Sequence, residues 1–353
     1  MISAIGQPYV IRDCGPQDRD AWEAYVRSHA QGTLFHLPQW SRAVARAYGH
    51  RPYHLAAWDG QRMVGVLPLF LVKSLFVGRV LISVPYATYG GILADSPPIT
   101  QALFEAATDL HRRLSTRYIE LRHRDSSGLE LPSIDRYDTF RKELATTPEG
   151  IMKQLPQKAR TAARKGLKLL GDDCVSFSPD NLDRVYDIYS RRLRELGSPN
   201  YRRAFFRVLQ EEFGQDCACI VVRSGHGQSL AGLMGFFFRD EFTSYFAGNV
   251  PHAFTASATA AMYLRTMEYV AQRGAKIFDL NRSRRDNSGP YQWKRHQGFT
   301  PEPLHYQIYN GGSGEMPNLT PSNRKFAIAS RAWKRMPLWF TRAMGGRLTK
   351  WIP

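Results

Sequence analysis

The chain has 353 residues, of which 43% are hydrophobic and 12% aromatic, so it is globular rather than disordered and is long enough for two domains. Its 48 Lys and Arg residues exceed its 31 Asp and Glu residues by 17, which favours anionic partners such as nucleic acid, phosphorylated carriers or an acidic membrane surface, with a merely soluble basic protein as the alternative. Four cysteines without a CxxC pair argue against a disulfide framework or a zinc site, and with no signal-peptide pattern at the N-terminus we expect a cytoplasmic location.

The first half of the chain alternates helices with strands. Pro38 stands where a helix prefers its first residue, and Gly49 follows the last residue of the same predicted helix. The dipeptide Asp59-Gly60 between two apolar runs is a strong hairpin signal. The predicted elements are a strand at 8–13, helices at 18–28 and 38–48, hairpin strands at 54–58 and 63–72, a strand at 80–85, a helix at 100–114 and a strand at 118–121.

The second half repeats this order. Its predicted elements are helices at 182–196 and 202–213, hairpin strands at 218–222 and 230–238, a strand at 242–248, a helix at 257–273 and a strand at 276–280. The matched pairs, which are 165, 167 and 159 residues apart, are Gly49 with Gly214, Gly65 with Gly232, and Glu120 with Asp279. A nearly constant offset indicates duplication. We therefore predict an α/β (α+β) fold of two similar domains, each with a mixed, mostly antiparallel sheet flanked by helices.

We place these domains at residues 1–150 and 173–312, with a basic helix at 151–172 connecting them. This helix carries five cations and no acid between Lys158 and Lys168. Arg160 and Arg164 are four residues apart and so project from one helix face. They either form a solvated cationic surface or bind a phosphate or carboxylate of an anionic substrate bidentately.

The segment 313–353 is a basic, Trp-rich tail. From Arg324 onward it contains eight Lys and Arg residues and no acid, with Trp333, Trp339 and Trp351 among them. This composition is typical of an interfacial amphipathic helix, which would contact an acidic membrane through residues 324–353. The alternative is that the tail packs on its own domain with the Trp residues in the core.

Residues 276–306 form the most conspicuous stretch. An apolar run that carries Asp279 ends in a polar loop, followed by a Gly-Pro turn at 289–290, the pair Trp293-Lys294 and a second strand at 304–309. A buried strand that ends in a dense polar loop is typical of a site placed on a rigid sheet.

This stretch, FDLNRSRRDNSGPYQWKRHQGF, resembles the signature of FemAB-like acyltransferases of the GNAT superfamily, and most narrowly the FemAB-related proteins associated with exosortase and PEP-CTERM systems. The likeness covers nearly the whole chain. Two positions depart from the pattern, since Asn281 replaces a glycine and Trp293 replaces a phenylalanine. The supporting residues are Phe278-Asp279, Arg282-Ser283, Gly289, Lys294, Gly298-Phe299 and the stretch 303–306, with Phe35, Gln39, Trp40, Gly90-Gly91, Arg160, Lys165-Gly166 and the tail stretch 333–338 elsewhere.

The resemblance implies tandem GNAT-like domains that transfer an acyl or aminoacyl group to an amine on a peptidoglycan precursor or another cell-envelope or exopolysaccharide-linked acceptor. It implies no tightly bound cofactor and a donor cosubstrate that is aminoacyl-tRNA or acyl-CoA. The long helical arm that some relatives use for tRNA has no counterpart in the sequence, which weakens a tRNA donor. The usual acetyl-CoA turn is also missing from residues 86–91 and 248–257, which counts against ordinary acetyl-CoA binding.

The resemblance and the chemistry of amide formation together suggest roles for several residues. The family's motif lysine falls on Lys294, which would stabilise the developing oxyanion or hold a phosphate. Asp279 would orient or deprotonate the amine, or else pair with Arg282 in a structural role. Tyr291 would donate to the leaving atom, unless it only packs. The further residues that we expect to bind substrate are Arg160, Arg164, Arg282, Ser283, Trp293, Gln39 and Trp40.

Other classes fit less well. No HExxH spacing indicates a metal site, and no homeodomain, zinc-finger or RRM pattern indicates sequence-specific DNA binding. Two alternatives share the fold: an acyl-CoA-dependent N-acyltransferase that acts on an amino sugar, and a catalytically idle GNAT-like module that recruits envelope machinery. We expect the protein in the cytoplasm, with peripheral contact at the inner face of the cell membrane as the further option.

Overall fold

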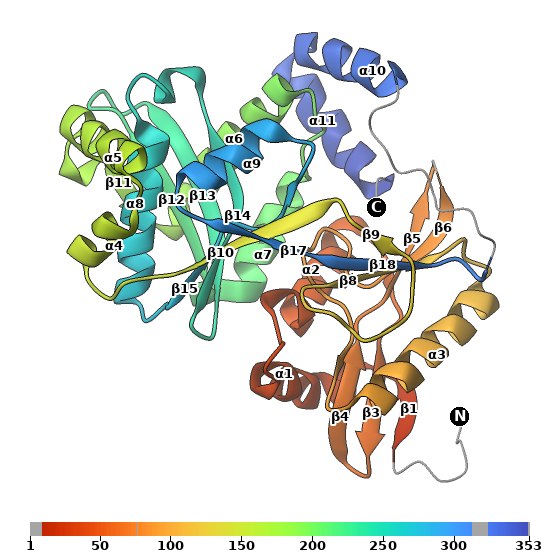
Figure 1. Cartoon of the computed structure of the whole chain (residues 1–353). Helices are drawn as coiled ribbons and strands as arrows, with labels where there is room; N and C mark the ends of the chain where they lie inside the picture. Colours follow the sequence, from red (N-terminus) through yellow and green to blue (C-terminus); the bar gives the residue numbers. More distant parts are fainter. Residues whose placement is uncertain (1–8, 76, 313–323, 352–353) are drawn as a thin grey trace. The chain divides into compact units, whose positions relative to one another are not determined.

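The computed structural model describes residues 9–75, 77–312 and 324–351. The chain divides into two compact units, shown with all helices and strands in Figure 1. The first unit comprises Met1–Arg136, Pro303–Leu319 and Lys350–Pro353, and the second comprises Tyr137–Glu302 and Thr320–Thr349.

The first unit has two sheets, with strand orders β1-β3-β4-β7 and β2-β5-β6-β8-β18-β9. Its helices are α1 (Arg19–Ser28), α2 (Pro38–Tyr48) and α3 (Pro97–Leu114). Its strands are β1 (Val10–Asp13), β2 (Arg51–Pro52), β3 (Leu55–Asp59), β4 (Arg62–Leu67), β5 (Phe70–Ser74), β6 (Gly78–Ile82), β7 (Leu93–Ala94), β8 (Ile119–His123), β9 (Ser133–Ile134) and β18 (His305–Tyr309).

The second unit has one sheet with the order β11-β12-β13-β14-β15-β10-β16, and β17 also pairs with β10. Its strands are β10 (Tyr137–Glu143), β11 (Val175–Phe177), β12 (Cys217–Arg223), β13 (Ser229–Phe238), β14 (Glu241–Asn249), β15 (Ile277–Asp279), β16 (Ser283–Arg284) and β17 (Thr300–Pro303). Its helices are α4 (Pro148–Gln154), α5 (Gln157–Leu170), α6 (Leu182–Leu196), α7 (Arg203–Phe213), α8 (Ala258–Gln272), α9 (Ser288–His296), α10 (Arg324–Arg335) and α11 (Leu338–Leu348).

Both units contain the same parallel strand pair. In the first unit β6 is parallel to β8, with Glu120 opposite Ile82, and α3 lies between these strands in the sequence. In the second unit β14 is parallel to β15, with Asp279 opposite Thr243, and α8 lies between them. Glu120 and Asp279 thus occupy equivalent positions, as the repeat predicts. The α/β fold with mixed sheets and flanking helices is confirmed.

Two strands lie in a different unit from the predicted domain. β10, which the sequence analysis did not identify, pairs antiparallel with β15 in the second unit. β18, predicted within the second domain at 173–312, pairs antiparallel with β8 in the first unit. The unit boundaries therefore lie at 136/137 and 302/303 instead of the predicted positions, because strand pairing joins segments that are distant in the sequence.

The basic segment predicted as a connection at 151–172 packs within the second unit. Its main helix, α5, contacts α8, and the buried residues of α5 are Ala159, Ala163 and Gly166. A Cβ atom added at Gly166 would lie only 2.6 Å from the Ser257 carbonyl oxygen, so the two helix backbones approach closely. Alanine and glycine on one face of a helix allow this approach.

The tail packs against α6 of the second unit. The Arg342 guanidinium forms an ion pair with Asp187 and donates a hydrogen bond to the Ser190 hydroxyl at 2.9 Å. Trp333 is half-buried, whereas Trp339 on α11 remains 72% exposed. Residues 313–323 and 352–353 of the predicted tail lie outside the described residues. Among the helices that the structure describes, none is both long and apolar enough to cross a membrane.

Candidate active site

The polar loop of the stretch 276–306 follows β15, and β15 pairs with β14 on one side and β10 on the other. Asp279, the last residue of this strand, is fully buried. Its carboxylate accepts hydrogen bonds from the Asn281 backbone N–H at 2.6 Å and from the Thr139 hydroxyl at 3.5 Å. These contacts turn the chain sharply at the end of the strand and fix the position of the loop.

Asn281 explains one departure from the FemAB-like pattern. Its φ is +60°, in the left-handed region that glycine adopts freely and that asparagine tolerates better than most residues. Its side-chain amide donates to the Ser244 carbonyl at 2.8 Å, which holds this conformation. The glycine of the family pattern is thus replaced by the residue type that best preserves the backbone turn.

Lys294 lies on α9, and its side chain connects this helix to the loop that follows β15. Its ammonium group donates to the carbonyl oxygens of Asn281 at 2.7 Å and Arg282 at 3.1 Å, and it lies 5.0 Å from the centre of the Phe140 ring. The residue is only 8% exposed. Burial lowers the pKa of Lys294 to about 7, although the nearby charge of Asp279 acts in the opposite direction. Both protonation states are therefore populated near neutral pH.

The Gly-Pro turn predicted at 289–290 is a helix in the structure. Gly289 and Pro290 lie in the first turn of α9, where the missing N–H of proline costs no hydrogen bond because first-turn N–H groups have no acceptor within the helix. The helix places Tyr291 and Lys294, three residues apart, on the same side. Both cover Phe140, since the Tyr291 ring packs edge-on against it at 5.1 Å.

Asp138 is a site residue that the sequence analysis did not identify. It lies on β10, is 4% exposed, and accepts hydrogen bonds from Arg285 Nε at 2.8 Å and from the Tyr291 hydroxyl at 2.5 Å. Burial and this carboxylate raise the pKa of Tyr291, so the phenol stays protonated. No local pattern marks Asp138, because its partners lie more than a hundred residues away in the sequence.

The remaining predicted residues of the second unit take different places. The Arg282 guanidinium lies 4.6 Å over the Tyr137 ring, and Ser283 is buried in β16. Trp293 instead packs against Tyr263 of α8, with 4.9 Å between the ring centres. The structure therefore gathers Asp279, Arg282, Ser283, Tyr291 and Lys294 around β10, β15, β16 and α9, whereas Trp293 contributes mainly to packing.

The other predicted substrate-binding residues lie elsewhere. Arg160 is half-buried and Arg164 is exposed on α5, whose small-residue face packs against α8. Gln39 and Trp40 belong to the first unit. The Gln39 side-chain amide donates a hydrogen bond to the Glu23 carboxylate at 2.9 Å. Trp40 is fully buried and packs edge-on against Phe35, with 4.7 Å between the ring centres. Trp40 is thus a core residue in this structure.

The buried ammonium of Lys294 predicts a pH-dependent stability. In the unfolded chain a lysine has a pKa of about 10.4, so between about pH 7 and pH 10 the unfolded state binds one proton more than the folded state. The unfolding free energy of the wild type, relative to that of Lys294→Met, should therefore rise with pH by about 1.4 kcal/mol per unit in this range. Urea unfolding at several pH values measures this slope, and a constant difference would show that Lys294 titrates normally.

Comparison with known proteins supports the GNAT assignment. Residues 153–295, which contain α5 to α8 and α9 up to Arg295, including Lys294, match the model of the acetyltransferase (GNAT) domain family. No curated protein matches the chain significantly in sequence. The match agrees with the prediction of an acyltransferase.

Three solved structures have a similar fold over most of their length. FemX superposes with a TM-score of 0.66 at 12% identity, covering 85% of this chain and 97% of FemX. A tandem GNAT protein from the clavulanic acid biosynthesis pathway superposes with a TM-score of 0.54 at 11% identity, covering 87% of this chain and 100% of that protein. The C-terminal domain of a candidate lysylphosphatidylglycerol synthetase from Agrobacterium fabrum superposes with a TM-score of 0.54 at 13% identity, covering 90% of this chain and 94% of that domain. Residues 153–295 thus match the GNAT acetyltransferase domain family, and the chain as a whole shares its fold with a tandem GNAT protein.

Proposed function

We propose that this protein is a FemAB-like N-acyltransferase that forms an amide on an amine of a cell-envelope or exopolysaccharide-linked acceptor. The observation that carries the proposal is the environment of Lys294. This residue falls on the lysine of the signature motif, lies within the range that matches the GNAT domain family, and donates hydrogen bonds to two backbone carbonyls. The fold similarity to FemX and the basic net charge of +17 favour the same class.

The chemistry requires positive charge where the carbonyl oxygen of the donor becomes an oxyanion. An ammonium group has three N–H donors, and the carbonyls of Asn281 and Arg282 accept two of them. The third N–H would donate to the oxyanion during attack by the acceptor amine. Asp279 favours the charged form of Lys294 and thereby supports this role.

Asp138 and Tyr291 are positioning residues in this proposal. The Tyr291 hydroxyl donates to Asp138, so its proton is already used in a hydrogen bond. Arg285, which lies in the loop before α9, donates a hydrogen bond to the same carboxylate. These contacts fix α9 against β10, and with it the position of the Lys294 ammonium. On α5, Arg160 and Arg164 supply cations four residues apart for an anionic acceptor.

The donor is either an aminoacyl-tRNA or an acyl-CoA. Incubating the purified protein with peptidoglycan and polysaccharide precursors, and with charged tRNA or acyl-CoA in parallel, tests the proposal by mass spectrometry. We expect one donor to add the mass of its acyl group to an amine of the precursor. Transfer from acyl-CoA to an amino sugar would favour the first alternative. An absence of transfer from every donor would favour the catalytically idle module.

The C-terminal helices support a peripheral membrane location. In α10 and α11 the side chains of Ile328 and Trp339 are 59% and 72% exposed, and Arg331, Lys334 and Arg335 are exposed nearby. Apolar side chains among cations with no acid are suited to a bilayer surface that carries anionic lipid.

We expect the protein to sediment with vesicles that contain phosphatidylglycerol and to remain in solution with phosphatidylcholine vesicles alone. Trp339→Ala should weaken this binding several-fold, because it removes an exposed aromatic anchor. The matched control is Phe254→Ala, which removes an aromatic side chain of similar exposure, 62%, outside the tail. Equal sedimentation with both vesicle types would contradict the proposed location.

A further inference from the structure

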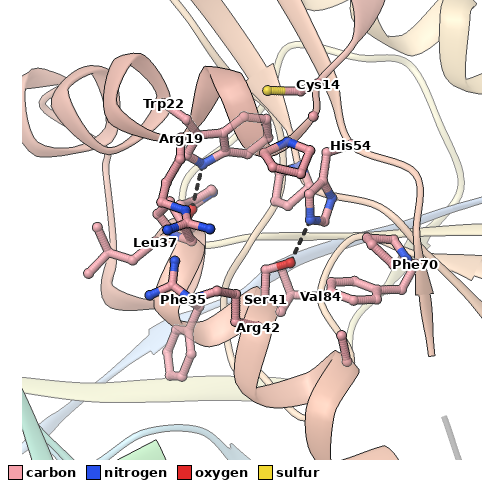
Figure 2. A pocket seen from close by; sticks show the side chains of 17 residues that line it. Cys14, Arg19, Trp22, Phe35, Leu37, Ser41, Arg42, His54, Phe70 and Val84 are labelled. Atoms are coloured by element: carbon pink, nitrogen blue, oxygen red, sulfur yellow. Dashed lines mark hydrogen bonds between the residues drawn. The ribbon is translucent and has the colours of Figure 1, made fainter. Parts of the chain in front are cut away.

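The first unit contains an apolar pocket that no predicted role uses. It has a volume of about 190 Å³ and lies among α1, the first turns of α2, and β5 (Figure 2). The aromatic residues Trp22, Phe35 and Phe70 line its walls together with Leu37, Val84 and four prolines. We call it the α1–α2 pocket. A concave, mainly apolar lining with few polar groups is typical of a small-molecule site.

One polar pair lies in the wall of this pocket. His54 Nδ1 accepts a hydrogen bond from the Leu69 backbone N–H at 3.2 Å, so the proton of the neutral ring resides on Nε2. This Nε2–H donates to the Ser41 hydroxyl oxygen at 2.5 Å. Burial lowers the pKa of His54 to about 4, which keeps the ring neutral at physiological pH.

This arrangement argues against a Ser-His nucleophile. His54 donates to Ser41 and so does not accept its proton, as a general base would have to do. The Ser41 hydroxyl proton is instead directed away from the ring. Cys14, also in the lining, has its pKa raised to about 12 by burial, so its thiol stays protonated. The α1–α2 pocket is therefore built for binding and not for covalent chemistry.

Positive charge gathers at one side of the pocket. Figure 2 shows the guanidinium groups of Arg19 and Arg42 close to each other there. The α2 helix also begins at this wall with Pro38, after Leu37, whose side chain cannot accept an N–H. Two guanidinium groups beside the positive end of a helix attract an anion.

The geometry points to a small amphiphilic anion as the ligand of the α1–α2 pocket: an aryl or short alkyl group in the aromatic chamber, with a carboxylate or phosphate at Arg19 and Arg42. The size fits, since the pocket volume of about 190 Å³ exceeds the roughly 150 Å³ that is enough for a benzene molecule. The Ser41 hydroxyl adds one donor inside the chamber. This assignment concerns the first unit alone and does not depend on acyl transfer by the second.

Calorimetric titration of the full chain with four six-carbon probes tests the assignment. Hexanoate and hexyl phosphate carry the expected anion, whereas hexanol is neutral and hexylamine is cationic. We expect both anions, or one of them, to bind at least about tenfold more tightly than hexanol, and hexylamine to show no binding. The ratio between hexanoate and hexyl phosphate identifies the preferred head group.

Two variants locate the binding. Ala45→Phe places a ring in the pocket and should abolish binding of the anionic probes, with Ala45→Leu as a smaller substitution if the first variant unfolds. Arg19→Glu should weaken binding of the anions at least about tenfold, whereas Arg79→Glu, the same charge change at an exposed arginine outside the lining, should not. The assignment would be overturned if hexanol bound as tightly as the anions, or if the anions still bound to Ala45→Phe. It would also be overturned if no probe bound at all.

Discussion

Replacing Lys294 by methionine is expected to lower the turnover number about 10²- to 10³-fold while the protein stays folded. The substitution removes the ammonium group from beside the carbonyls of Asn281 and Arg282. Methionine has a flexible apolar side chain that tolerates burial, so the lost hydrogen bonds are partly offset by the removal of a buried charge. Steady-state kinetics, with circular dichroism as the folding check, measure the effect.

A matched control separates this role from packing. Lys142 is a half-buried lysine of the second unit, whereas Lys294 is buried; it likewise donates to a backbone carbonyl, that of Gln154 at 3.1 Å, and its ammonium lies 5.4 Å from the centre of the Phe299 ring. Lys142→Met should leave the turnover number within a few-fold of the wild type. If Lys294→Met and Lys142→Met behave alike, the proposed electrostatic role of Lys294 is wrong.

The pH dependence of the same variant series identifies the active form of Lys294. Because its pKa is about 7, the charged form is lost as the pH rises above neutrality. Stabilisation of an oxyanion needs this charged form, so the turnover number should fall above about pH 7. A turnover number that rises through this pH range and becomes flat in Lys294→Met would instead identify the neutral amine as a general base.

Replacing Glu120 by alanine is expected to destabilise the first unit by about 3–5 kcal/mol. Its carboxylate pairs with Arg122 at 2.6 Å, and the two side chains are only 6% and 4% exposed. Arg122 also donates to the carbonyls of Val84 and Ala87 at 3.1 Å, so it stays in place when its carboxylate partner is removed. The variant then keeps a buried guanidinium without the compensating charge. Urea unfolding measures the loss.

Two comparisons check this explanation. In an Arg122→Leu background the further change Glu120→Ala should cost much less, because no buried cation remains to be compensated. Asp109→Ala breaks an ion pair with Arg112 whose side chains are 39% and 72% exposed, and it should cost less than about 1 kcal/mol. An equal loss in Glu120→Ala and Asp109→Ala would show that burial of the pair does not determine its effect.

Several elements could be predicted from the sequence because their signals are local. The helix predicted at 182–196 is α6 with the same bounds, since its apolar residues follow helical spacing and Gly197, with a φ of +76°, ends it. The repeat predicted the equivalence of Glu120 and Asp279, which the two parallel strand pairs confirm. The signature motif drew attention to Lys294 without showing its surroundings.

The sequence by itself determined the order of helices and strands, the duplication and the loop that carries the candidate site, because side-chain spacing and backbone preferences act over a few residues. Only the tertiary structure decided that β10 belongs to the second unit and β18 to the first, that Asp138 contacts Tyr291 and Arg285, and that Lys294 is buried. Strand pairing and burial depend on contacts between distant segments. The same burial lowers the pKa of Lys294, and so the chemistry of this lysine is a property of the folded protein.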